Sequence, residues 1–409
     1  MKHHALATTL TILGLISVQV AARPYPGVSG LAATADSALT AGTNPAGITR
    51  FSEPALDIEV IWFTSESEWE SSFDESDVTF TSTDSGDTII PRFAYVYPIN
   101  DKWATSFTFL GTGFSEDFGS DWPGRYFIIE YSSVLVSAFP SLAYRINDQW
   151  SVAGSVAITY TSFEQERAIR NIFDPGIGDG RSELESDSIE FGFGLSTLYE
   201  MTDRTRFGLT YQSEIEPSRD ADVDYSRLGP NTEAVMDRLG IIGGDLTLES
   251  TSPQSATAGL YHEWENNHAV TLDFAWIDFS RFSLSEYYFN GEAIVESTVD
   301  YKDIWAASAS YTFPMSDRWM LGVSAAITTD MVDDEDRSIT LRLDEVWTVG
   351  VGAEFQWTDT RSVYASAAYI RVGDAPVNSD PVPGVGELQG RFTSRDIWQF
   401  QVGVSFGGI

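Results

Sequence analysis

The sequence predicts an all-β fold: a 14-stranded antiparallel transmembrane β-barrel with an N-terminal hatch that plugs the lumen. Three observations predict it. Segment after segment alternates between a bulky apolar face and a small or polar face, short connections take turns with long ones, and beyond residue 22 no stretch approaches the ~18 apolar residues of a transmembrane helix. We divide the chain into a signal peptide (1–22), a hatch (23–54) and a barrel (55–409).

The first 22 residues have the layout of a secretory signal. Lys2 gives a weakly basic start, an apolar run extends from Leu6 to Val20, and Ala21 and Ala22 supply the small residues of a cleavage site. The alternative is an uncleaved anchor helix, which the interspersed Thr and Ser residues disfavour. An exported chain without a membrane-spanning helix is periplasmic, secreted or an outer-membrane barrel, and the strand pattern favours the cell outer membrane.

Period-two alternation is clearest in the predicted strands at 151–160, 270–276, 347–355 and 398–406. In the first of these, Val152, Val156, Ile158 and Tyr160 share one face, while Ser and Ala dominate the other. A soluble β-sandwich also alternates, but its exposed face carries Lys, Glu and Arg. Here the second face is mostly Gly, Ala, Ser and Thr, which indicates a lumen on that side and lipid against the bulky side.

The connections between these strands are of two alternating kinds. Six are short polar turns, at 100–102, 147–149, 202–204, 265–267, 315–317 and 358–360. Seven are long and rich in Asp, Glu, Gly and Pro, at 64–88, 111–132, 161–187, 213–253, 280–302, 328–344 and 371–394. Six turns and seven loops join 14 strands, with both chain ends and the short turns on the periplasmic side.

Tryptophans recur beside the short turns. The five residues concerned are Trp103, Trp150, Trp264, Trp319 and Trp357. Indole rings favour the boundary between membrane and water, so their position predicts the periplasmic aromatic girdle. Tryptophan also favours strands in general, but its recurrence beside one kind of turn favours the girdle.

Composition excludes several classes of function. The 409-residue chain carries 24 Lys and Arg against 60 Asp and Glu, a net charge of −36, which disfavours nucleic acid as a partner. No cysteine and only four histidines are present, two of them in the predicted signal peptide. We expect no enzyme activity, no cofactor and no metal site. The acidic run Asp333–Asp336 could bind divalent cations, but a solvated surface is the simpler interpretation.

The stretch 23–54 lacks alternation and leads through Asn44-Pro45-Ala46-Gly47 into the first predicted strand. Further along the chain come TSPQSA at 251–256, TLDFAWIDFSRF at 271–282, DIW at 303–305 and SDRW at 316–319. In this order these motifs resemble the FadL/TodX family of outer-membrane transporters for long-chain fatty acids and aromatic hydrocarbons. The resemblance extends over essentially the whole chain after residue 22.

This resemblance implies a barrel that takes up hydrophobic compounds passively, with lateral diffusion out of the barrel wall into the outer membrane. It implies a hydrophobic small-molecule ligand, lipid and lipopolysaccharide as surroundings, insertion by the outer-membrane assembly machinery, and a monomer. Two other classes are considered: an outer-membrane hydrolase that uses His262 or His268, and a structural or adhesive barrel without transport.

The resemblance assigns roles to the hatch. Asn44, Pro45, Ala46 and Gly47 match the family's hatch motif, in which a rigid turn fixes the plug. Four apolar hatch residues are candidates for a substrate pocket in the lumen: Leu31, Leu39, Ile48 and Phe51. Packing of the hatch against the barrel wall explains the same four residues equally well.

Two further candidate sites lie in the barrel. The stretch 231–243 has apolar residues at helical spacing, with Asn231 as the expected helix cap and Glu233 in the first turn. Together with the loop at 161–187 it is a candidate external capture groove, formed by Ile169, Ile172, Phe173, Val235, Met236, Leu239 and Ile242. Packing between the loops is the alternative. The third strand is expected to end near Leu110, and Gly111 and Gly113 after it are candidates for a lateral gate.

Overall fold

The computed structural model describes residues 29–73, 79–215, 218–249, 251–282, 286–290, 292–295, 301–334, 337, 344–378 and 388–407. The predicted signal peptide (1–22) lies outside these residues. No helix in the described ranges is long and apolar enough to cross a membrane.

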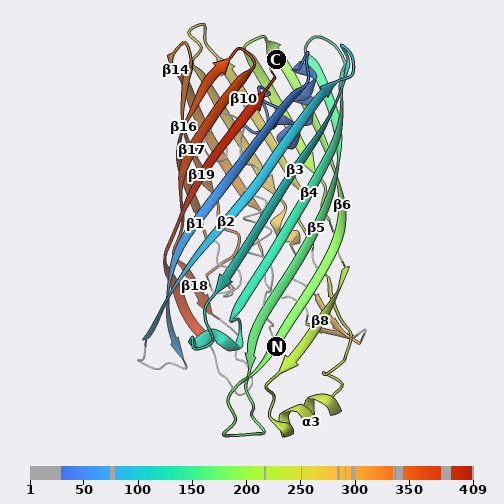
Figure 1. Cartoon of the computed structure of the whole chain (residues 1–409), viewed down its shortest axis with the longest axis vertical. Helices are drawn as coiled ribbons and strands as arrows, with labels where there is room; N and C mark the ends of the chain where they lie inside the picture. Colours follow the sequence, from blue (N-terminus) through green and yellow to red (C-terminus); the bar gives the residue numbers. More distant parts are fainter. Residues whose placement is uncertain are drawn as a thin grey trace.

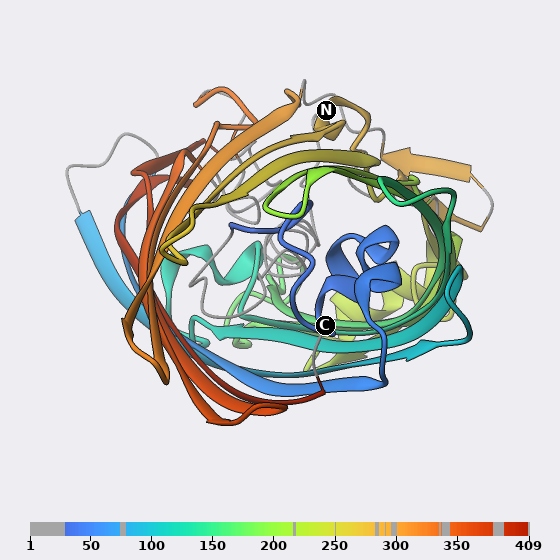
Figure 2. The same cartoon turned by 90° about the horizontal axis from the view of Figure 1, so that it is seen from above.

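Fourteen long antiparallel strands in the described part of the chain close into one barrel (Figures 1 and 2). Each pairs with the next in the sequence, and the first and last pair with each other from Leu56↔Phe406 onward. The strands are β1 (Ala55–Phe73), β2 (Thr79–Pro98), β3 (Trp103–Asp117), β4 (Glu130–Arg145), β5 (Trp150–Ile169), β6 (Gly180–Thr202), β7 (Thr205–Gln212), β10 (Ser255–Glu263), β11 (Ala269–Ile277), β14 (Ile304–Ser316), β15 (Trp319–Thr328), β16 (Val346–Thr358), β17 (Arg361–Val372) and β19 (Leu388–Phe406). The predicted 14-stranded barrel is confirmed.

Shorter elements occupy the connections and the lumen. The short strands are β8 (Ser218–Ser226), β9 (Leu246–Glu249), β12 (Glu286–Phe289), β13 (Glu292–Val295) and β18 (Ala375–Asn378). The helices are α2 (Thr40–Thr43), α3 (Pro230–Arg238) and the short 3-10 helices η1 (Pro45–Arg50), η2 (Pro123–Tyr126) and η3 (Phe279–Arg281). The short turns, the C-terminus and α2 lie at the top in Figure 1, and α3 lies at the opposite end.

Several predicted loops were too long, because the strands extend further than expected. β5 and β6 stay paired from Trp150↔Tyr199 to Ile169↔Gly180, although 161–187 was predicted as one loop. β1 likewise reaches Phe73, and β3 continues beyond Leu110 to Asp117. Where these strands leave the apolar belt, their side chains become Ser, Thr and Glu, as in residues 64–72. Alternation of apolar and polar residues therefore disappears while the hydrogen-bonded ladder continues.

The outer face of the barrel is apolar, as the alternation predicted. On β6, Ile189, Phe191, Phe193 and Leu195 are all more than half exposed. Inward positions elsewhere carry small buried residues such as Ala143, Ser155 and Thr210. An exposed apolar surface of this extent on a closed barrel is the surface that lipid covers.

Tryptophans mark both edges of the apolar belt. The five beside the short turns are exposed, in agreement with the predicted girdle. A second exposed set, which the sequence analysis did not identify, consists of Trp305, Trp347 and Trp398. These lie about ten residues further along their strands, which at ~3.3 Å per residue and a tilt near 40° corresponds to about 25 Å. That height matches the hydrocarbon core spanned by outer-membrane barrels.

The lumen is filled at both ends. Near the short turns, the described residues 29–54, here called the N-terminal segment, lie inside the barrel (Figure 2). At the other end, the connection from Phe118 to Ile129 folds inward, and Trp122 and Phe127 join Trp69 and Phe392 in a buried apolar cluster. The space between these two fillings contains the cavity described below.

Candidate functional site

The Asn44-Pro45-Ala46-Gly47 motif forms a rigid turn inside the barrel. Asn44 caps η1: its Oδ1 accepts from the Ala46 N–H at 3.1 Å, and its Nδ2 donates to Thr197 O of β6 at 3.1 Å. Pro45 occupies the first position of the helix, where its missing N–H costs nothing. A Cβ on Gly47 would approach the Ala35 Cβ to 2.7 Å, so this position requires glycine. The motif therefore joins the turn of the N-terminal segment to the barrel wall.

A buried carboxylate on β11 holds the start of the N-terminal segment. Asp273 accepts three consecutive backbone N–H groups, from Gly30 at 2.6 Å, Leu31 at 3.3 Å and Ala32 at 3.1 Å. Gly30 has φ +78°, a left-handed conformation that glycine adopts without strain. Three donors aimed at one carboxylate form a strong, charge-assisted contact.

Other wall residues fix the rest of the segment. Arg206 Nε donates to Ala33 O at 3.1 Å, and Asp57 Oδ2 accepts from the Leu39 N–H at 3.2 Å. Two wall glycines leave the necessary room: a Cβ on Gly208 would meet Ala32 O at 1.7 Å, and one on Gly259 would meet the Ala32 Cβ at 2.9 Å. These wall residues could not be predicted from the sequence, since nothing in a strand pattern shows what its small inward residues face.

The four apolar candidates of the predicted hatch are all buried. Leu39, Ile48 and Phe51 belong to one cluster with Leu198 of β6 and Tyr364 of β17. Leu31 is 6% exposed beside the Asp273 contact. None of the four is among the residues that line the cavity described next. In this conformation they pack the segment against the wall.

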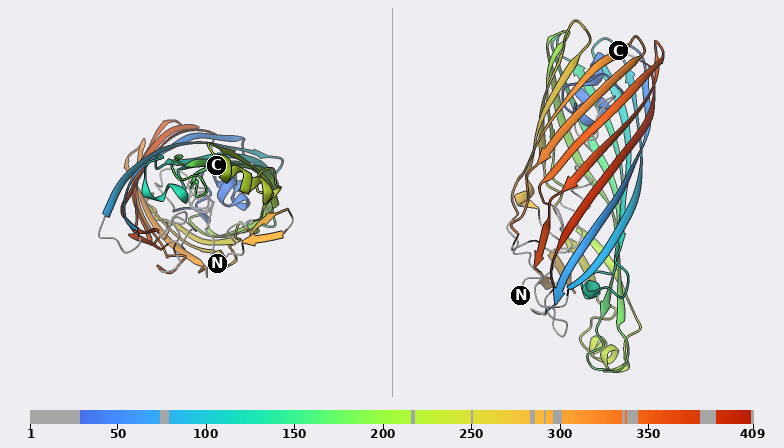
Figure 3. Two further views of the ribbon diagram at one scale, coloured as in Figure 1. Left: turned by 90° about the horizontal axis from the view of Figure 1, so that it is seen from below. Right: turned by 90° about the vertical axis from the view of Figure 1, so that its left-hand side faces the viewer.

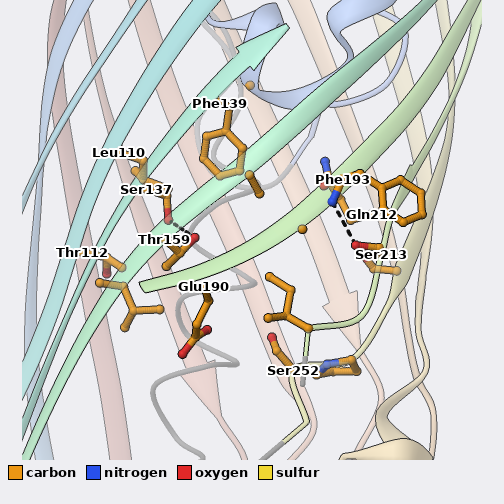
Figure 4. Close-up of a pocket in the computed structure, with 17 residues that line it drawn as sticks. Leu110, Thr112, Ser137, Phe139, Thr159, Glu190, Phe193, Gln212, Ser213 and Ser252 are labelled. Carbon is orange, nitrogen blue, oxygen red and sulfur yellow. Dashed lines mark hydrogen bonds between the residues drawn. The ribbon is translucent and has the colours of Figure 1, made fainter. Parts of the chain in front are cut away.

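A cavity of about 130 Å³ lies in the lumen between β3, β4, β5 and β6 (Figure 4). Gly42 of α2 also lines it. Its apolar lining includes Leu110, Leu135, Phe139, Ile215 and Pro253. Its polar lining includes Thr112, Ser137, Thr159, Glu190, Gln212 and Ser252. Ser137 and Thr159 are hydrogen bonded to each other at 2.9 Å. The cavity is thus apolar with polar groups at intervals, the usual character of a small-molecule site.

Beside the cavity, the hydrogen-bonded pairing between β2 and β3 stops, and we call this unpaired stretch the seam. Among the described residues of these strands, their pairing ends at Arg92↔Leu110, although β3 continues to pair with β4 as far as Asp117↔Glu130. Beyond this point β2 follows β1 instead. Pro91 has no N–H to donate, and Gly111 lies against it, with an ideal Cβ 3.6 Å from the Pro91 ring.

The two glycines predicted for a lateral gate lie near this seam, but one part of that prediction was wrong. Gly111 and Gly113 lie within β3 and do not follow its end. Gly111 stands where the two strands separate, and Leu110 and Thr112 on either side of it line the cavity. Proline and glycine, one on each strand, remove the hydrogen bond and the side-chain packing that would continue the pairing.

The two predicted capture loops lie side by side at the far end of the barrel (Figures 1 and 3). Asp174, from the loop between β5 and β6, accepts from the Asn231 and Thr232 N–H groups at 3.0 and 2.8 Å and from the Thr232 hydroxyl at 3.0 Å. The predicted cap was wrong: the N-cap position is Gly229, and Asp174 from another loop satisfies the free N–H groups of α3. Glu233 does lie in the first turn, as expected.

The apolar candidates of these loops differ in exposure. Ile172, Phe173 and Leu239 are about half exposed or more, at 53%, 49% and 65%. The remaining four are partly buried: Ile169, Val235, Met236 and Ile242. The Asp174 contact holds Phe173 beside the start of α3, where the Asn231 side chain also donates to Phe173 O at 3.4 Å.

Docking of α3 should depend on pH through Asp174. Burial acts to raise its pKa, but the hydrogen bonds from Thr232 and Asn231 outweigh it and hold the pKa below the usual range. The contact is therefore fully present above the ordinary aspartate value of about 3.9 and is lost as pH falls through the lowered pKa. A spin label on Asp237→Cys should stay immobile from pH 7 to about 4 and become mobile below.

Asp174→Asn should release the label at neutral pH, because the amide lacks the charge and one of the two acceptor oxygens. Asp245→Asn, an exposed aspartate close to α3 in the chain, serves as the matched control and should leave the spectrum unchanged. A label that is equally immobile in both variants would contradict this role of Asp174.

The two histidines beside a short turn do not form a catalytic group. His262 Nδ1 is 2.9 Å from the Thr205 hydroxyl, and His268 Nδ1 contacts the Tyr311 hydroxyl. Each pairs with the neighbouring strand at the end of the barrel opposite α3. In the described residues no group of three or more His, Asp or Glu side chains is placed to hold a metal ion.

A closed barrel with an apolar belt, a filled lumen and a cavity beside a wall seam defines an outer-membrane transport protein. Comparison with known proteins gives the particular family. Residues 14–406 match the family described as outer membrane protein transport protein (OMPP1/FadL/TodX), and the chain belongs to it. The protein is therefore located in the outer membrane and is a transporter, not an enzyme.

Relatives and solved structures agree with this assignment. The chain is 24% identical over 381 residues to the long-chain fatty acid transport protein of Escherichia coli O6:H1, covering 84% of this chain and 83% of the relative. A FadL homologue from Pseudomonas aeruginosa superposes with a TM-score of 0.81 at 16% identity, over 93% of this chain and 97% of the other. The toluene transporter TodX of P. putida gives 0.63 at 14% identity, over 89% and 92%.

Proposed function

We propose that the protein takes up hydrophobic small molecules, either long-chain fatty acids or aromatic hydrocarbons, and releases them sideways into the outer membrane. The names of its relatives supply these two ligand classes. The main support for sideways release is the seam between β2 and β3. It begins at Gly111, directly beside the cavity-lining residues Leu110 and Thr112.

Physical chemistry favours such a lateral exit. An apolar solute that left through a water-filled pore would regain the hydration cost it had lost on entering the cavity. Gly111 lies eight positions after Trp103 on β3, or about 20 Å above the short-turn girdle at ~3.3 Å per residue and a tilt near 40°. A molecule leaving there enters the outer leaflet of the membrane without crossing water.

We propose that the N-terminal segment is part of a hatch, residues 23–54, that plugs the lumen. Its hydrogen bonds to Asp273, Asp57 and Arg206 support a plug that is docked in the resting state. Movement of this segment would uncover Leu31, Leu39 and Ile48, which then become part of the route. Residues 1–22 are proposed as a cleaved signal peptide.

The surroundings of the barrel follow from its closed sheet. β1 pairs with β19, so the described strands close into a barrel within one chain, and we expect a monomer that contacts lipid and lipopolysaccharide through its apolar belt. Insertion of such a barrel requires the outer-membrane assembly machinery, which we propose as a transient partner.

Uptake of radiolabelled oleate or toluene into proteoliposomes tests the function. Phe173→Glu combined with Leu239→Glu should lower the initial uptake rate several-fold at low ligand concentration, because two charges in the capture groove oppose apolar binding. Ala234→Glu, which adds a charge at an exposed position of α3, is the matched control and should leave the rate unchanged.

Different results would contradict the capture groove and the proposed function. Equal uptake by the double variant and the control would contradict the role of the groove alone. Absence of protein-dependent uptake for both oleate and toluene would contradict the proposed function itself.

A further inference from the structure

The cavity has the size of one aromatic ring. Its volume of about 130 Å³ is close to that of an engineered protein cavity of ~150 Å³ that binds benzene. Drug-sized ligands need ~300 Å³ or more, so a long alkyl chain is not enclosed here. Leu110, Leu135 and Phe139 supply the apolar surface that a ring requires.

Glu190 makes one part of this cavity a hydrogen-bond acceptor. The Glu190 side chain is only 10% exposed. Both of its described contacts use Oε1: the Ser188 hydroxyl donates to it at 2.7 Å, and Arg219 Nε lies 3.6 Å from it. The other oxygen, Oε2, has no described hydrogen bond or ion pair and belongs to a side chain that lines the cavity (Figure 4).

A carboxylate in a confined apolar site selects its ligand by charge. Its charge, which Arg219 offsets only in part at 3.6 Å, opposes an anionic carboxylate, and Oε2 has no hydrogen to donate to one. A hydroxyl donor instead replaces the water that Oε2 would otherwise need. A hydrocarbon without a donor leaves Oε2 without a partner, which costs binding free energy. The lining therefore favours a neutral ligand with one donor.

We propose that this cavity binds a single-ring aromatic compound bearing one neutral hydroxyl, such as a phenol, with the ring against Leu110, Leu135 and Phe139 and the hydroxyl donating to Glu190 Oε2. This rests on the proposed function and narrows its ligand class. Phenols are neutral at pH 7, because their hydroxyl titrates near 10.

Three ligands of one shape test this selection: p-cresol, toluene and p-toluate, which differ only in the group opposite the methyl. Calorimetry on the purified protein in detergent should show p-cresol binding about tenfold or more tightly than toluene, and no binding of p-toluate. Glu190→Gln should weaken p-cresol binding by about tenfold and should not weaken toluene binding, because the neutral amide costs less to leave without a partner. Glu185→Gln, an exposed acid on the same strand, is the control and should change neither.

A second variant allows the proposal to be tested even if the Glu190→Gln variant does not fold. Ala157→Phe fills the cavity from β5 and should abolish binding of both neutral ligands. Equal affinity for p-cresol and toluene in the unaltered protein, or an unchanged p-cresol affinity in a folded Glu190→Gln variant, would overturn the proposal. If proteoliposomes still take up toluene in that case, the proposed function survives; if they take up neither toluene nor oleate, the proposed function fails instead.

Discussion

Asp273→Ala should turn the barrel into a leaky pore. Its carboxylate accepts hydrogen bonds from Gly30, Leu31 and Ala32, and three bonds to a charged acceptor contribute on the order of 5 kcal/mol. Loss of only about 2.7 kcal/mol of this raises the undocked population of the N-terminal segment about 100-fold. We expect the ion conductance in planar bilayers to increase at least tenfold.

Asp317→Asn, at an exposed position of a short turn, provides the control and should keep the low conductance. Deletion of residues 31–48 gives the upper limit of the leak. If Asp273→Ala conducts like the control while the deletion conducts strongly, Asp273 is not the anchor. If the deletion also stays closed, the segment is not what blocks ions, and the apolar cluster around Trp122 and Phe127 at the other end is enough to close the lumen.

Closing the seam between β2 and β3 should stop uptake. The chain contains no cysteine, so Pro91→Cys with Gly111→Cys introduces one defined pair at the first unpaired position of the two strands. We expect a disulfide, since an ideal Cβ at position 111 lies only 3.6 Å from the Pro91 ring. If the seam is the exit, the oxidised protein should lose about 90% or more of its uptake of hydrophobic molecules. Reduction of the disulfide should restore that uptake.

The matched control is Val323→Cys with Val351→Cys, an exposed pair on the regularly bonded strands β15 and β16. Its oxidation should not change uptake. Full uptake by the oxidised Pro91–Gly111 variant would show that hydrophobic molecules leave the barrel elsewhere.

The barrel could be predicted from the sequence because lipid imposes a strict pattern on it. Wherever a strand crosses the membrane, every second residue must be apolar, so segments such as 151–160 can be recognised as strands from their sequence. The same rule predicted too little strand in residues 64–73, where Ser, Thr and Glu make up most of the sequence and the alternation stops. The hydrogen-bonded ladder continues there without a hydropathy signal.

The site was only partly predictable, because it depends on contacts between distant residues. The motif at Asn44 was found by resemblance, but its partner Thr197 and the anchor Asp273 lie far away in the sequence. Asp174 replaced Asn231 as the acceptor at α3 for the same reason. Glu190 did leave a signal: with Ile189 and Phe191 facing lipid, the residue between them must face the lumen.

The length of β6 has a consequence for how ligands reach the protein. Its 23 residues at ~3.3 Å and a tilt near 40° rise roughly 55–60 Å, about twice the hydrocarbon thickness that outer-membrane barrels span. About half of the height of the barrel therefore extends beyond the membrane into the medium, and α3 lies at the outermost end (Figure 3). A dissolved molecule therefore first meets the protein in the surrounding medium, above the headgroups, and its arrival rate is set by free diffusion there.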